Sequence, residues 1–199
     1  MDKISSEILN PDHFSTTLSG QSKDFVESTS SLLFAFMLAL VLIYLVLAAQ
    51  FESFRDPLII MLTVPLALIG ALVSLWAGGV TMNIFSQIGL IMLIGLVSKN
   101  GILIVEFANQ RRASGLDKLS AVKEASASRF RPILMTSMST ILGVLPMVFA
   151  SGAGAESRIS MGIAVAGGLI FSTFFTLFII PAMYLYISSN KYSLTHDEK

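Results

Sequence analysis

Residues 57–98 form a continuous apolar stretch, PLIIMLTVPLALIGALVSLWAGGVTMNIFSQIGLIMLIGLVS, with 42 positions and no Asp, Glu, Lys or Arg. The hydrocarbon core of a bilayer is about 30 Å thick, and an α-helix needs about 20 apolar residues to cross it. The stretch is therefore long enough for two crossings. Gly78 and Gly79 interrupt it near the middle and indicate a turn. The sequence predicts two helices, over about 57–77 and 84–108, that meet on one side of a membrane.

Three more windows lack charged residues, at 28–51, 132–155 and 159–190, and the four windows together cover 122 of the 199 residues. Each is long enough for one further crossing. They predict helices over about 29–50, 133–150 and 161–187. We therefore expect an all-α, polytopic membrane bundle of five transmembrane helices over residues 29–188.

The composition excludes most other classes of protein. Only 13% of the residues are charged, 54% are hydrophobic, and the mean hydropathy is +0.76, whereas soluble domains are about 25% charged. The net charge of zero gives no attraction to nucleic acid. The chain has no cysteine, and His13 and His196 stand alone in polar end segments. We find no catalytic triad, metal cluster or nucleotide-binding loop, and expect neither an enzyme nor a bound cofactor.

The polar connection over residues 109–131 carries its own pattern. Leu119, Val122, Ala125 and Phe130 recur at roughly helical spacing among charged residues. This spacing predicts an amphipathic helix over about 116–128 that lies at the membrane surface. A solvated linker is the alternative.

The positions of Lys and Arg predict how the chain is oriented. If the five helices alternate, nine of the 13 basic residues fall on one side, in segments 50–57, 108–131 and 188–199. Three fall on the other side. The positive-inside rule then places the C-terminus in the cytoplasm and the N-terminus in the periplasm. Residues 1–28 have too little apolar content to fold alone, so we expect the chain to be part of something larger.

Lys99 is the one basic residue inside a predicted span. It lies about nine residues, or about 13 Å, from the cytoplasmic end of its helix, too deep for its side chain to reach the interface. Glu106 is about 10 Å further along the axis, and no other carboxylate lies inside a predicted span. Either Lys99 is neutral or its counter-ion belongs to another chain segment. An ionisable residue at this depth is a candidate functional site; a structural lysine that lines a water cavity is the alternative.

Polar groups near Lys99 provide candidate hydrogen-bond partners for a charge relay. Asn100 follows it directly, and the predicted helix over 133–150 carries four hydroxyl residues: Thr136, Ser137, Ser139 and Thr140. Hydroxyls in membrane helices also serve as contacts between helices or bond to their own backbone. Both interpretations stay open for these residues.

Several long motifs resemble one known family. They are LAAQFESFRDPL at 47–58, GLVSKNGILIVEFA at 95–108, RPILMTS at 131–137, LGVLP at 142–146 and GAG at 152–154. In this order and spacing they are similar to the last five helices of resistance-nodulation-cell division transporters, and to their hydrophobe/amphiphile efflux branch. The resemblance implies that residues 1–28 are the end of a periplasmic porter domain and that residues 189–199 are a cytoplasmic tail.

The resemblance also implies a function. Such transporters are multi-pass proteins of the bacterial inner membrane that export hydrophobic or amphiphilic compounds and confer multidrug resistance, with the proton-motive force in place of a cofactor. Lys99 matches the lysine of their proton relay, which pairs with two aspartates in the half that this chain lacks. Asn100 lies beside it, and Thr136 and Arg129 match polar residues that help to pass protons. Ser98 and Gly101 stand where alanine is common in the family.

The resemblance implies partners as well. They are the missing N-terminal half, the lipid bilayer, two further copies in a homotrimer, a periplasmic adaptor and an outer-membrane channel. An alternative is an inactive truncated membrane module, or a split-transporter subunit without activity alone. A small self-assembling channel is a third possibility, disfavoured because one unpaired lysine per subunit repels its copies.

Overall fold

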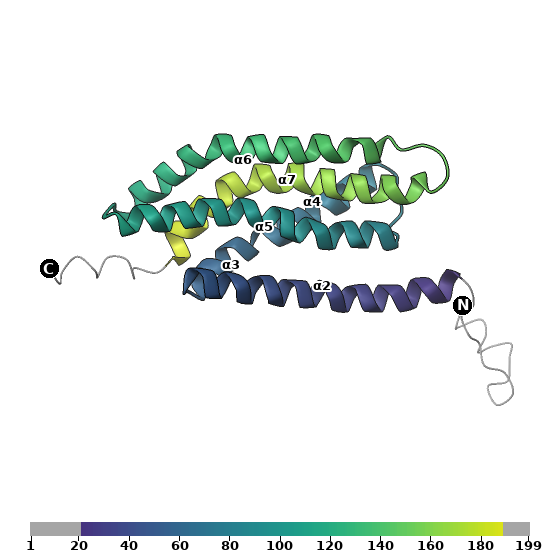
Figure 1. The fold of residues 1–199 in the computed structure, drawn as a ribbon, viewed down its shortest axis with the longest axis horizontal. Helices are drawn as coiled ribbons and strands as arrows, with labels where there is room; N and C mark the ends of the chain where they lie inside the picture. Colours follow the sequence, from purple (N-terminus) through teal and green to yellow (C-terminus); the bar gives the residue numbers. More distant parts are fainter. Residues whose placement is uncertain (1–20, 189–199) are drawn as a thin grey trace, which may run out of the picture.

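The computed structural model describes residues 21–188, which form helices and no strand (Figure 1). The helices are α2 (Gln21–Phe51), α3 (Arg55–Met61), α4 (Thr63–Ala77), α5 (Ile84–Ala113), α6 (Lys118–Val148) and α7 (Ala155–Ile187). Five segments are long and apolar enough to cross a membrane, with α3 and α4 counted as one. The predicted all-α membrane bundle is confirmed. The expectations for residues 1–20 and for the tail at 189–199, with His13 and His196, lie outside the described residues.

The helix predicted over 57–77 is divided into α3 and α4, and Leu62 lies between them. Pro65 explains the division. Its ring nitrogen cannot donate to the carbonyl of Met61, and its ring crowds that carbonyl. The hydroxyl of Thr63 donates to the Ile60 carbonyl at 2.7 Å, so a side chain satisfies one of the backbone groups near the break.

One continuous helix, α6, replaces the surface helix and the span that we predicted separately over 116–128 and 133–150. Asp117 caps its start, because its side chain accepts from the Ser120 backbone N–H at 3.3 Å. Pro132 lies inside the helix, where neighbouring groups in a membrane protein compensate for its missing N–H. The apolar face of the first turns, including Val122 and Ala125, is buried in a core cluster of the bundle.

Helix α7 is the centre of the bundle and packs against α3, α4, α5 and α6. It approaches α4 and α5 closely at glycines. A Cβ added at Gly70 would lie 2.2 Å from the Phe171 Cβ, and one at Gly168 would lie 2.2 Å from the Leu93 Cδ2. Small residues of this kind let membrane helices pack backbone to backbone.

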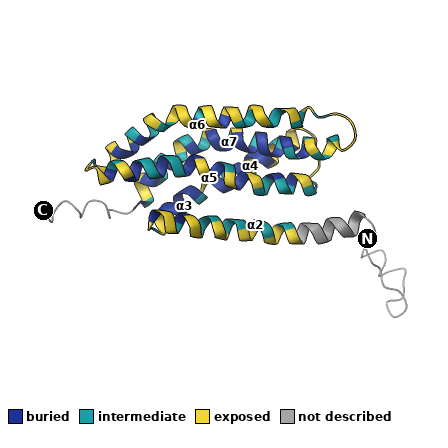
Figure 2. Cartoon of the chain, viewed as in Figure 1, coloured by how far each residue is buried: buried dark blue, intermediate teal, exposed yellow. Residues whose placement is uncertain are grey.

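Helix α2 is the least covered element. It contacts α3 and α5 and otherwise lies apart from the rest (Figure 1). Figure 2 shows it mostly exposed where its burial is described, whereas α4, α5 and α7 carry most of the buried residues. Leu47 and Phe51 at its end are buried. Helix α2 therefore packs closely against the bundle at its α3 end and loosely at its opposite end.

Candidate functional site

Lys99 lies on an open face of α5. Its side chain is exposed, although Ser98 and Asn100 on either side of it are only 3% and 4% exposed. One turn earlier, a Cβ added at Gly95 would meet nothing within 4 Å. Within residues 21–188, no hydrogen bond or ion pair is formed by the Lys99 ammonium. The structure thus presents this cation at a helix surface that no other described element covers.

Glu106 does not pair with Lys99. It is half-buried two turns along α5, and its carboxylate accepts from the Gln110 side chain at 3.4 Å. Another carboxylate near α5, that of Glu124, forms an ion pair with Arg111 at 2.7 Å. In the described part of the chain, neither carboxylate neutralises the Lys99 ammonium.

Asn100 takes part in a buried polar contact between three helices. Its Nδ2 donates to the Ser137 Oγ of α6 at 3.1 Å, and the Thr173 Oγ1 of α7 donates to the same oxygen at 3.0 Å. All three side chains are at most 6% exposed. Asn100 therefore joins α5 to α6 and α7 instead of extending the open face that carries Lys99. Sequence reasoning picked out Ser137 and missed Thr173.

Thr136 lies on an exposed face of α6 and bonds to its own helix. Its Oγ1 donates to the Ile133 carbonyl at 3.1 Å. Ser139 is also exposed, and a Cβ at Gly143 would meet nothing within 4 Å. Because these positions are spaced by three and four, they lie on one face of the helix. Small and polar residues thus form a second open stripe, on α6.

Arg129 lies away from Lys99, where α5 and α6 approach their connecting turn. Its guanidinium carbon is 4.6 Å from the centroid of the Phe107 ring, a cation–π contact. Its Nε is buried without a hydrogen bond. Phe107 is eight residues from Lys99, about 12 Å along the helix axis. The structure does not bring these two candidate relay residues together.

A second polar cluster, which sequence reasoning did not identify, lies at the same end of the bundle as Arg129. Asn109 Nδ2 donates to Asp56 Oδ2 at 2.9 Å, and the Tyr184 hydroxyl donates to Asn109 Oδ1. Nearby, Arg112 Nη1 donates to the Ser188 Oγ at 3.3 Å. All five residues are less than 8% exposed. The cluster ties α3, α5 and the end of α7 together.

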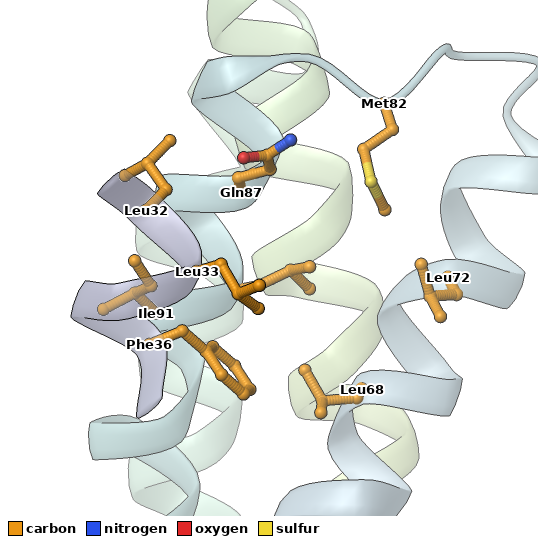
Figure 3. Close-up of a pocket in the computed structure, with 9 residues that line it drawn as sticks. Leu32, Leu33, Phe36, Leu68, Leu72, Met82, Gln87 and Ile91 are labelled. Carbon is orange, nitrogen blue, oxygen red and sulfur yellow. The ribbon is translucent and has the colours of Figure 1, made fainter. Parts of the chain in front are cut away.

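An apolar cleft opens between α2, α4 and α5 near the other end of the bundle (Figure 3). Its volume is about 300 Å³. Leu32, Leu33 and Phe36 of α2 face Leu68 and Leu72 of α4 across it (Figure 3). Gln87 is the polar side chain in its lining. The cleft accounts for the loose packing of α2, and it contains no group suited to carry protons.

Comparison with known proteins finds one matching family and several similar transporters. The model of the AcrB/AcrD/AcrF family matches residues 1–188. An uncharacterized transporter of Haemophilus influenzae is 43% identical over 186 residues, which cover 90% of this chain and 18% of that protein. The multidrug resistance protein MdtC of Erwinia tasmaniensis is 41% identical over 172 residues, covering 86% of this chain and 17% of that protein. MdtC of Photorhabdus laumondii is 38% identical over 186 residues, covering 93% and 18%. The chain thus spans less than a fifth of the length of these relatives.

Proposed function

The chain belongs to the AcrB/AcrD/AcrF family, and on that premise we propose that it forms the C-terminal membrane part of a proton-driven efflux pump. It is a multi-pass inner-membrane protein. In this proposal Lys99 is the lysine of the proton relay. The observation that carries the proposal is an exposed ammonium without a partner in the described chain, on an uncovered face of α5.

An uncovered lysine near the middle of a membrane helix is costly if it faces lipid. The face around it therefore meets protein or water in the working molecule. The open positions near Lys99 and on α6 suit close contact with further helices, because Gly95, Ser139 and Gly143 have small side chains. The missing half of the transporter occupies this face and brings the acidic partners of Lys99.

Protonation of such a partner changes the packing energy. A lysine and a carboxylate about 4 Å apart attract each other by about 4 kcal/mol at an effective dielectric constant near 20. Loss of that attraction on protonation is enough to favour a second arrangement of the helices. The buried contact of Asn100 with Ser137 and Thr173 makes α5, α6 and α7 move together when Lys99 shifts.

Thr136 and Arg129 have supporting roles in this proposal. Thr136 lies on the open face of α6, where the missing half approaches, and relays protons through its hydroxyl. Arg129 is held against Phe107 and adjusts the local charge at the cytoplasmic end of the pathway. The resemblance in sequence supports a homotrimer with a periplasmic adaptor and an outer-membrane channel. The two MdtC relatives, named as multidrug resistance proteins, support hydrophobic or amphiphilic compounds as the exported molecules.

The test places substitutions in the complete transporter polypeptide that contains this chain, reconstituted in vesicles. Export of a lipophilic dye is measured after a proton gradient is applied. Lys99→Ala and the length-matched Lys99→Met are expected to abolish export while the amount of protein in the membrane stays unchanged. Arg55→Gln, which removes an exposed cation at the end of the bundle, is the control and keeps export. Normal export by Lys99→Ala would refute the proposed role of Lys99.

A further inference from the structure

A groove separates the first turns of α6 from the last turns of α7. Its volume is about 580 Å³, within the size range of small-molecule sites. Leu119 and Phe130 of α6 and Leu185 of α7 contribute apolar walls and are 48%, 47% and 37% exposed. The groove is therefore an open, apolar surface feature, and not a gap in the core.

Lys123 is the charged residue in the lining of this groove. Its side chain is exposed, and in the described residues its ammonium forms no hydrogen bond or ion pair. Two neighbouring cations are already engaged. Lys118 Nζ donates to the Ser188 carbonyl at 2.8 Å, and Arg111 pairs with Glu124 at 2.7 Å. Lys123 therefore offers an unneutralised positive charge beside an apolar surface.

The length of α6 places this groove at the edge of the bilayer. Its 31 residues extend for about 46 Å, about 16 Å more than the hydrocarbon core. The charged residues of α6 all precede Pro132, so the excess length lies at the α6 start. Lys123 is consequently at the level of lipid headgroups. Phe130 and Pro181 line the end of the groove nearest the hydrocarbon.

The groove faces away from the surfaces used by the proposed relay. Lys123 and Arg129 are six residues apart, so they lie about 120° apart around the helix, and Arg129 points toward Phe107 of α5. Lys123 and Thr136 are 13 residues apart, so they lie about 140° apart around the helix. The groove therefore opens toward lipid instead of toward the missing half.

We propose that this groove binds one anionic phospholipid, with its phosphate at the Lys123 ammonium and an acyl chain along the apolar walls. A basic residue in a groove between membrane helices, at headgroup depth, suits an anionic headgroup. The lining from Leu119 to Phe130 is about 16 Å long, enough for a large part of an acyl chain. Zwitterionic lipids carry a cationic group that Lys123 repels. The proposal depends on the chain's place in a membrane and not on its part in export.

The experiment uses the purified 199-residue chain with phosphatidylglycerol or phosphatidylcholine of identical acyl chains, and native mass spectrometry counts the lipids retained. We expect the chain to retain phosphatidylglycerol preferentially. Lys123→Gln lowers that retention about fivefold, the effect of one lysine near an anionic surface. It leaves phosphatidylcholine retention unchanged. Arg55→Gln, the matched control, removes another exposed cation that does not line the groove. It is expected to leave the retention of both lipids within about twofold of the unchanged chain.

A second variant tests the apolar part of the site. Ala182→Phe fills the groove from α7, at an exposed position, and leaves Lys123 in place. It is expected to reduce phosphatidylglycerol retention while circular dichroism shows an unchanged helix content. Equal retention of the two lipids by the unchanged chain overturns the proposal, and so does an equal loss in Lys123→Gln and Arg55→Gln. A change of oligomer size in Ala182→Phe without a change in lipid retention indicates a second copy in the groove and also overturns it.

Discussion

Asn109 of α5 donates a hydrogen bond to Asp56 of α3 at 2.9 Å, across 53 positions of sequence. Asp56 is 2% exposed and Asn109 is 7% exposed. The carbonyl oxygen of the same amide accepts from Tyr184 of α7. A single amide thus satisfies groups from two other helices at the end of the bundle where α2, α3 and the end of α7 meet.

Removal of that amide should destabilise the bundle strongly. Asn109→Ala takes a donor from the Asp56 carboxylate, whose Oδ1 already has no hydrogen bond. A lost hydrogen bond to a buried charge costs about 2–3 kcal/mol. Thermal unfolding in detergent, followed by far-ultraviolet circular dichroism, measures the change. Gln110→Ala is the control, since Gln110 is exposed and a surface change costs at most about 0.5 kcal/mol. Equal stability of the two variants would contradict the role of this amide.

The close approach of α4 and α7 at Gly70 leads to a second prediction. A Cβ at this position would lie 2.2 Å from the Cβ of Phe171, an atom fixed to the α7 backbone. Gly70→Ala should therefore destabilise the chain by about 1–3 kcal/mol, as overpacking does. Gly95→Ala is the matched control, because its Cβ meets nothing within 4 Å and alanine favours helix by about 1 kcal/mol. The same unfolding measurement should show opposite signs for the two variants.

Much of the fold was predictable because membrane-spanning helices can be recognised from the composition of a short stretch of sequence. The charge-free windows give the five spans, since a buried charge is costly wherever it lies in the helix. The continuity of α6 was not predictable in the same way. The charged first turns resembled a separate element, whereas the cap at Asp117 and the packing of Val122 make one helix of the whole stretch.

The candidate site likewise contains residues that the sequence reveals and residues that only the structure reveals. Lys99 stands out in the sequence because it is the one basic residue inside a predicted span, and Glu106 in the same span is about 10 Å away along the axis. The structure places Lys99 on an uncovered face. The cluster of Asp56, Asn109 and Tyr184 depends on contacts across 53 and 75 positions, which no local pattern encodes. Arg129 was placed with Lys99 by resemblance alone, and its contact with Phe107 puts it near the end of the helix.

The shared hydroxyl of Ser137 leads to a third prediction. Ser137→Ala leaves Asn100 and Thr173 without their common acceptor inside the bundle. An unsatisfied buried polar group costs about 1–3 kcal/mol, so the unfolding temperature should fall. Ser139→Ala is the control on the same helix, where the residue is exposed. If the two alanine variants unfold together, the contact between α5, α6 and α7 carries no net stability.

Orientation in the membrane can be tested directly because the chain has no cysteine. The α4–α5 and α6–α7 turns lie at one end of the bundle, and the α5–α6 turn lies at the other (Figure 1). The distribution of Lys and Arg predicts that the first two turns face the periplasm. A membrane-impermeant thiol reagent should label Ser151→Cys in intact cells and Ser114→Cys only after the cells are opened. Both positions are exposed, and the reverse labelling pattern would show the opposite orientation.

The start of α6 should respond to acid. The Asp117 carboxyl accepts hydrogen bonds from the side chain and from the backbone N–H of Ser120. These bonds, the side-chain bond most of all, hold the pKa of the Asp117 carboxyl below its ordinary value of 3.8. Because the folded pKa is lowered, the capping contribution is fully present above the unfolded pKa and is lost as the pH falls through the folded one. Amide hydrogen exchange in the first turn of α6, corrected for intrinsic rates, should therefore accelerate below about pH 4. Asp117→Asn keeps a cap without a charge and should remove this pH dependence, whereas Asp117→Ala should expose the first turn at every pH. A pH response that persists in Asp117→Asn would assign it to another group.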